Sequence, residues 1–198
     1  MTNNVEGKSP YLPLLRSRRD KTWLPVKNCE IIHEYEAGAL LEIEYFSGEY
    51  DDVYFASWDP YTLQHTQSML DSIEFEASKN RKLFFHREII GVSKGDIDLE
   101  TVLVTSRTDH KQKATLQNSK VFAVFLARRH GCWESSSSIL VESMIRYLCN
   151  TDDPIVSSLL ERINFLFFPM ANPDSVYDGD SKKAKDYPSF IIDALDQI

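Results

Sequence analysis

The chain has 198 residues, enough for one large domain or two small ones, and 42% of them are hydrophobic, as in an ordinary globular protein. Its 30 acidic residues outnumber the 22 lysines and arginines, and the net charge of -8 argues against nucleic acid as a partner because phosphates would not be neutralised. The 3 cysteines lack CxxC spacing, and the N-terminus lacks the apolar core of a signal peptide, so we expect a cytoplasmic protein. No apolar run approaches the roughly 18 residues of a membrane span, so we expect no membrane partner.

The N-terminal part of the sequence predicts antiparallel β structure behind an irregular arm. Residues 1–27 are polar and interrupted by proline, which favours either an extended arm or the irregular edge of a domain. Apolar and acidic residues then alternate from Leu41 to Tyr45, which is the period of a half-buried strand. A turn at Ser47-Gly48 leads to a second strand at residues 53–56.

A helix and two strands are predicted next. Pro60 opens a helical stretch whose apolar residues fall roughly on one face: Leu63, Met69, Leu70 and Ile73. Residues 83–91 and 98–106 then form two strands, joined by the turn at residues 93–96.

Strands and helices alternate in the remaining sequence. Residues 121–126 form an apolar run that is typical of a central strand covered on both faces. The serines at 135–138 offer N-cap hydroxyls to a helix with one apolar stripe, made of Leu140, Val141, Met144, Ile145 and Leu148. Asp153-Pro154 caps a short helix with five residues facing inward, namely Ile155, Val156, Leu159, Leu160 and Ile163. With the buried strand at residues 163–168, this order predicts a right-handed βαβ unit and an α/β fold.

Two polar loops therefore follow neighbouring strands of the predicted sheet, at residues 127–134 and 172–179. Open α/β sheets bind ligands in the crevice beyond the carboxyl ends of their strands. The first loop brings together His130 and Glu134, whose imidazole nitrogen and carboxylate oxygen are both accepted by zinc. Composition alone favours a capped turn with an exposed histidine, and a metal-binding pair is the alternative.

Short motifs between about residues 40 and 182 keep a recognisable order and spacing: residues 52–62, 87–91, 96–99, 127–130 with 134–138, and 169–174. This succession resembles the cytosolic carboxypeptidases of the zinc metallocarboxypeptidase class (peptidase M14). The resemblance implies an N-terminal β-sandwich-like domain over residues 1–59 and the first part of a mixed-sheet α/β carboxypeptidase domain over residues 60–198. It also implies zinc-dependent removal of C-terminal residues, above all glutamate, from protein tails such as those of polyglutamylated tubulin.

The resemblance implies zinc ligands and a substrate-binding residue, with departures from the family pattern. The family motif His-Pro-Gly-Glu has its two ligands three residues apart, whereas His130 and Glu134 are four apart, as if one residue were inserted. A pair at i and i+4 on a helix still shares a metal in the HExxH motif. Ser175 replaces the glycine of the family's Asn-Pro-Asp-Gly. Lys182 falls where the family has the arginine that polarises the substrate carbonyl, and it keeps the charge without the planar fork.

Other parts of the family's site have no counterpart before Ile198. Residues 184–188 contain nothing like the Asn-Arg pair that grips the substrate carboxylate, and the third zinc ligand and the glutamate base belong to segments further downstream in the family. Because a catalytic zinc needs three protein ligands and a base, we expect weak or absent zinc binding and no hydrolysis by this chain itself. The two hypotheses are a truncated carboxypeptidase-type protein and a non-catalytic binding module. A chain that stops after the strand at 163–168 would expose a hydrophobic sheet edge, through which it could associate with a partner.

Overall fold

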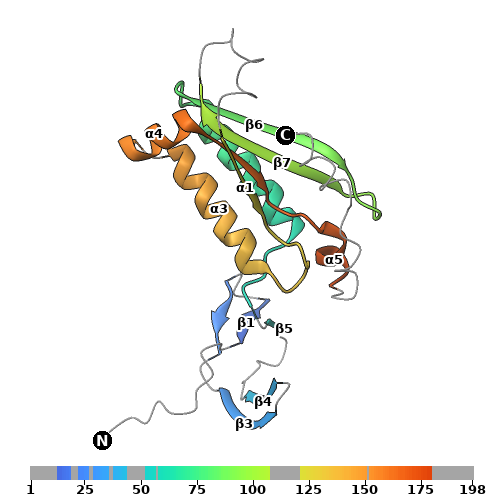
Figure 1. The fold of residues 1–198 in the computed structure, drawn as a ribbon. Coiled ribbons are helices and arrows are strands. Elements are labelled where there is room, and N and C mark those ends of the chain that lie inside the picture. Colours follow the sequence, from blue (N-terminus) through green and yellow to red (C-terminus); the bar gives the residue numbers. More distant parts are fainter. Residues whose placement is uncertain are drawn as a thin grey trace, which may run out of the picture. The chain divides into compact units, whose positions relative to one another are not determined.

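The structure is a computed structural model that describes residues 13–18, 22–26, 29–35, 38–43, 52–56, 58–107, 121–150 and 152–179. The contacts within the chain divide it into two compact units, Met1–Pro60 and Tyr61–Ile198. The described residues confirm the coarse expectation of a small antiparallel β region followed by a mixed α/β region (Figure 1).

The described residues of the first unit form two small antiparallel sheets. One sheet has the order β2-β1-β5, and the other is a hairpin of β3 and β4. Leu14 of β1 pairs with Ala56 of β5 and with Pro25 of β2, so residues that we expected in the irregular arm belong to a sheet. That expectation was wrong because strand partners far along the chain supply pairing that a short local pattern does not reveal. The strands are β1 (Leu14–Ser17), β2 (Leu24–Pro25), β3 (Cys29–Tyr35), β4 (Gly38–Ile43) and β5 (Val53–Ala56).

The second unit is built on a four-stranded mixed sheet with the order β6-β7-β9-β8. β6 and β7 form the predicted antiparallel hairpin, β9 runs antiparallel to β7, and β8 and β9 are parallel. The strands are β6 (Leu83–Val92), β7 (Asp98–Ser106), β8 (Val121–Leu126) and β9 (Ile163–Phe168). The helices are α1 (Leu63–Ser78), α3 (Ser135–Asn150), α4 (Pro154–Arg162) and α5 (Pro173–Asp178).

The order of the strands corrects two expectations. β9 lies between β7 and β8, so residues 163–168 form an interior strand rather than an exposed edge. β8 is at the edge of the described sheet, so residues 121–126 are not a central strand there, although their side chains pack into hydrophobic clusters on both faces as expected. An apolar run indicates that a strand packs against something, but the strand order depends on where the connecting chain returns to the sheet.

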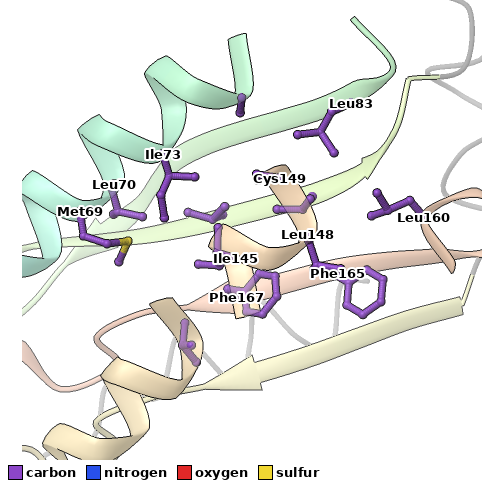
Figure 2. Close-up of a cluster of buried hydrophobic side chains, with 14 of the residues drawn as sticks. Met69, Leu70, Ile73, Leu83, Ile145, Leu148, Cys149, Leu160, Phe165 and Phe167 are labelled. Atoms are coloured by element: carbon purple, nitrogen blue, oxygen red, sulfur yellow. The ribbon is translucent and has the colours of Figure 1, made fainter. Parts of the chain in front are cut away.

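The main hydrophobic core lies between one face of this sheet and the helices α1, α3 and α4. Leu70 and Ile73 of α1 and Ile145 of α3 are fully buried in one cluster with Phe165 and Phe167 of β9 (Figure 2). Each such side chain contributes roughly 1.5–3 kcal/mol of burial free energy. Because successive side chains of a strand point to opposite faces, the intervening residues of β9 belong to a second cluster on the other face of the sheet.

Side-chain caps determine where α1 and α4 begin. Thr62 caps α1 by accepting a hydrogen bond from the backbone N–H of His65, whose ring in turn accepts from the Thr62 N–H, so α1 begins at Leu63 and not at Pro60. Asp153 caps α4 through the Ile155 N–H, with proline at the first position as predicted. No described helix is long and apolar enough to cross a membrane.

The predicted apolar stripes of α3 and α4 were partly wrong. Leu140 is 61% exposed, whereas Cys149 at the end of α3 is buried. In α4 only Val156 and Leu160 are buried, and Ile155 is 68% exposed. A helix of two and a half turns presents one narrow face to the sheet, so apolar residues outside that face stay in solvent.

Candidate metal-binding site

The two polar loops predicted from the sequence lie side by side at the carboxyl ends of β8 and β9. The Ala127 N–H donates to the carbonyl of Phe168, and the Ala171 N–H donates to the carbonyl of Ala127, both at 2.9 Å, so the loops continue the strand ladder. The Asn172 side-chain amide donates to the carbonyl of Arg129 at 3.4 Å. These bonds confirm the expected contact of the two loops.

His130 and Glu134 meet directly in the first loop. The Nδ1 atom of His130 and the Oε1 atom of Glu134 are 2.7 Å apart, and the second carboxylate oxygen accepts the backbone N–H of His130 at 2.9 Å. The His130 side chain is 63% exposed and that of Glu134 is 33% exposed. An imidazole and a carboxylate are therefore held together at the surface, on the side of the sheet edge where ligands bind in α/β folds.

The electrostatics of this pair favour an ionised carboxylate. Partial burial acts to raise the pKa of Glu134, but the hydrogen bonds from the backbone and ring of His130 act in the opposite direction. Coulombic interactions with His130 and Arg128 add to that effect, so the pKa of Glu134 lies below its ordinary value. Glu134 is consequently an ionised carboxylate at neutral pH, and its oxygen atoms are suitable ligands for a metal ion.

The pair suits zinc by its donor atoms and their separation. Zinc binds imidazole nitrogen and carboxylate oxygen at about 2.0–2.2 Å, so one ion touching both atoms needs them roughly 3 to 3.5 Å apart. The observed 2.7 Å is a direct hydrogen bond that a slight opening of the pair would convert to that spacing. Among the described residues no group of three or more His, Cys, Asp or Glu side chains is arranged to hold a metal ion, so His130 and Glu134 stand as two candidate ligands without a third. Lys182, the predicted substrate-binding residue, lies outside the described residues.

Two departures from the family pattern touch each other in this site. Gly131 adopts a left-handed conformation with a φ of 81°, and its α-carbon lies against the side chain of Ser175 in α5. A β-carbon at position 131 would overlap both the Oγ and the Cβ atoms of Ser175. The serine that replaces the family's glycine therefore occupies space that the glycine after His130 leaves open.

The turn between β6 and β7 also contacts the second loop. Asp174 at the start of α5 accepts hydrogen bonds from the Ser93 hydroxyl at 2.5 Å and from the Gly95 N–H at 3.2 Å, which fixes the turn between β6 and β7. The sequence pattern did not single out this contact, because Asp174 and the hairpin turn are some 80 residues apart.

Two of the four serines at the start of α3, Ser137 and Ser138, bind the loops. The Ser137 hydroxyl donates to the carbonyl of Glu134 and accepts the backbone N–H of Arg128. The Ser138 hydroxyl donates to the carbonyl of Pro169 at the end of β9. These bonds join α3 to both loops.

Residues 74–183 match the zinc carboxypeptidase family, peptidase M14. The chain belongs to this family. The match spans the end of α1, the whole described mixed sheet and both loops of the candidate site, so the zinc carboxypeptidase relationship includes His130 and Glu134.

Curated relatives of this chain include cytosolic carboxypeptidases. It is 30% identical to cytosolic carboxypeptidase 6 of Mus musculus over 188 residues, which cover 90% of this chain and 33% of the mouse protein. The human protein of the same name is also 30% identical, with 35% of its length covered. The chain thus spans about a third of the length of these relatives.

Solved structures show the same fold at lower identity. A metallo-carboxypeptidase from Burkholderia cenocepacia superposes with a TM-score of 0.62 and 18% identity, over 86% of this chain and 40% of that one. A metallo-carboxypeptidase from Pseudomonas aeruginosa gives a TM-score of 0.60 and 21% identity, over 85% and 39%. The architecture of the described residues is that of a carboxypeptidase fold.

Proposed function

We propose that this chain carries two ligands of a carboxypeptidase-type zinc site, the Nδ1 atom of His130 and the Oε1 atom of Glu134. The observation that carries the proposal is their 2.7 Å contact beyond the carboxyl end of β8, within the segment that matches the family. When bound in such a site, zinc lowers the pKa of a water molecule and polarises the substrate carbonyl. His130 and Glu134 supply one neutral and one anionic donor.

The parent reaction that we propose is removal of a C-terminal residue, glutamate first of all, from protein tails such as polyglutamylated tubulin. An acidic tail needs positive charge near the site, because the chain as a whole carries a net charge of -8. Arg129 is exposed next to His130 and supplies one such charge. We assign Lys182 to the substrate, in the place of the arginine of the family. The names of the relatives favour the cytoplasm as the compartment.

We also propose that the 198-residue polypeptide does not hydrolyse peptides on its own. Two candidate ligands among the described residues support weak zinc binding, since catalytic zinc sites have three protein ligands and a base for the bound water. The second candidate function is a non-catalytic binding module. It is supported by the hydrogen bonds within and between the two loops, which form without a metal ion.

Zinc binding tests the ligand assignment. Nuclear magnetic resonance titration of the metal-free chain with zinc should shift the ring signals of His130, with a weak dissociation constant. His130→Ala should abolish that saturable shift. His86→Ala is the matched control, because His86 and Glu88 form another exposed histidine–carboxylate pair, 3.7 Å apart on β6, far from the loops in the sequence. Zinc binding that survives His130→Ala unchanged would remove the assigned ligand.

Peptide hydrolysis tests the activity. The purified chain, incubated with zinc and a polyglutamylated peptide, should release no C-terminal glutamate above a His130→Ala blank. Robust zinc-dependent release would refute the inactive state. Binding of the same peptide without release, measured by fluorescence anisotropy, would favour the binding module, and a Lys182→Ala variant with weaker peptide binding would support the substrate assignment.

A further inference from the structure

Arg128 is buried between the candidate site and the body of the second unit. It is 2% exposed, the largest of the fully buried side chains, and its backbone has a φ of 58°. A left-handed conformation costs a residue with a β-carbon about 1 kcal/mol or more, so the surrounding contacts must hold it there. A buried guanidinium likewise persists only where its N–H groups find acceptors.

Those acceptors come from three directions. Nη1 donates to the carbonyls of Gly131 at 3.0 Å and Cys132 at 2.8 Å. Nη2 donates to the carbonyl of Tyr61 just before α1, and Nε donates to the Ser138 hydroxyl in α3 at 3.2 Å. Each of these acceptors is neutral, so Arg128 binds backbone and hydroxyl groups in place of a carboxylate.

The contacts to Gly131 and Cys132 bear directly on the candidate ligands. Both carbonyls belong to the short stretch between His130 and Glu134, which contains the extra residue relative to the family motif. With both carbonyls turned toward one Nη1 atom, this stretch curls around the guanidinium. Its two ends then bring the imidazole and the carboxylate to 2.7 Å. The other two contacts anchor the same guanidinium to α1 and α3, which do not belong to the loop.

We propose that Arg128 is the positioning residue of the His130–Glu134 pair: its planar guanidinium sets the loop conformation in which both candidate ligands face one point. This inference rests on the proposed zinc-binding function. A lysine would place one ammonium with three donors at the end of a flexible stem and could not reach four acceptors spread around a plane. Arg128→Lys therefore keeps the charge and removes the positioning.

The test compares Arg128→Lys with the wild-type chain in two measurements. In the metal-free protein, nuclear magnetic resonance should show that the Glu134 amide and the His130 ring lose their wild-type shifts, while core amides of α3 and β9 keep theirs. In the zinc titration, affinity should fall about 10-fold to 100-fold, the usual range when a residue that orients a metal ligand is replaced. Arg87→Lys is the matched control, because Arg87 is an equally well bonded arginine, held by Asp71 and Glu100, away from the loop. It should leave zinc affinity unchanged.

A second variant keeps the test decisive if Arg128→Lys does not fold. Ser138→Ala removes the Nε acceptor, together with the hydrogen bond from that hydroxyl to the Pro169 carbonyl, and should weaken zinc binding several-fold. Ser143→Ala, which removes an exposed hydroxyl bonded within the same helix, should have no effect. Unchanged His130 and Glu134 signals and unchanged zinc affinity in both Arg128→Lys and Ser138→Ala would overturn the inference while leaving zinc binding intact. If the wild-type chain binds no zinc through His130, the proposed function fails, and the metal-free spectra still decide whether Arg128 positions the pair.

Discussion

Replacing Gly131 by alanine should destabilise the second unit through two separable effects. The first is conformational, since the φ of 81° that glycine adopts freely is energetically unfavourable for alanine. The second is steric, since the new β-carbon would lie well inside the 3.0 Å limit of real contacts with the Ser175 side chain. Ser175 is fully buried in α5.

The two effects have comparable magnitudes. The left-handed conformation costs alanine about 1–2 kcal/mol, and forcing an extra carbon into a packed site typically costs about 1–3 kcal/mol. Gly131→Ala should therefore lower the free energy of unfolding by about 2–5 kcal/mol, a large share of the roughly 5–15 kcal/mol of an ordinary domain. Ser175→Gly in the Gly131→Ala background should restore the steric part and leave the conformational part.

Urea unfolding of the four proteins of this double-mutant cycle, followed by circular dichroism, measures both effects. The expected coupling free energy between positions 131 and 175 is about 1–3 kcal/mol. Gly179→Ala is the control for the conformational part, because Gly179 has a φ of 65° and nothing within 4 Å of an added β-carbon. Additive losses at positions 131 and 175, within about 0.5 kcal/mol, would show that the two residues do not share the space that the structure assigns to them.

Two further predictions concern titratable groups. The pKa of Glu134 is lowered by folding, so its contribution to stability should be fully present above the ordinary glutamate pKa of about 4.3 and be lost as the pH falls through the lower folded value. Metal-free Glu134→Gln should accordingly be less stable than wild type by about 0.5–1 kcal/mol at pH 6, and a gap in unfolding free energy that does not shrink toward pH 2 would contradict this account. Burial raises the pKa of the Cys149 thiol to about 12, whereas Cys132 is partly exposed, so iodoacetamide at pH 8 should modify Cys132 and spare Cys149 until urea unfolds the chain. Peptide mapping by mass spectrometry measures both rates, and equal rates would argue against the described packing of α3.

Much of the second unit could be predicted from the sequence because its signals are local. The two strands at residues 83–91 and 98–106 with the turn between them, the Asp153-Pro154 cap and the apolar run at 163–168 each involve neighbours in the chain, and each corresponds to an element of the structure. The order of the loops along the chain likewise placed His130 and Glu134 at the carboxyl end of a strand. The contact of the two side chains is also local, since they are four residues apart.

Tertiary structure decided what depends on partners distant in the sequence. β9 lies between β7 and β8, and β1 pairs with β5. These pairings depend on which strand edges come together when the chain folds, and a local sequence pattern does not contain that information. Nothing in the local sequence distinguishes Arg128 from an ordinary surface arginine. In the structure its guanidinium is buried and donates hydrogen bonds to Tyr61 and to α3. The contact between Gly131 and Ser175 joins residues 44 positions apart through packing alone. The sequence by itself determined which groups stand at the site, and the tertiary structure determined what holds them, because hydrogen-bond partners and excluded volume exist only once the loops are brought together.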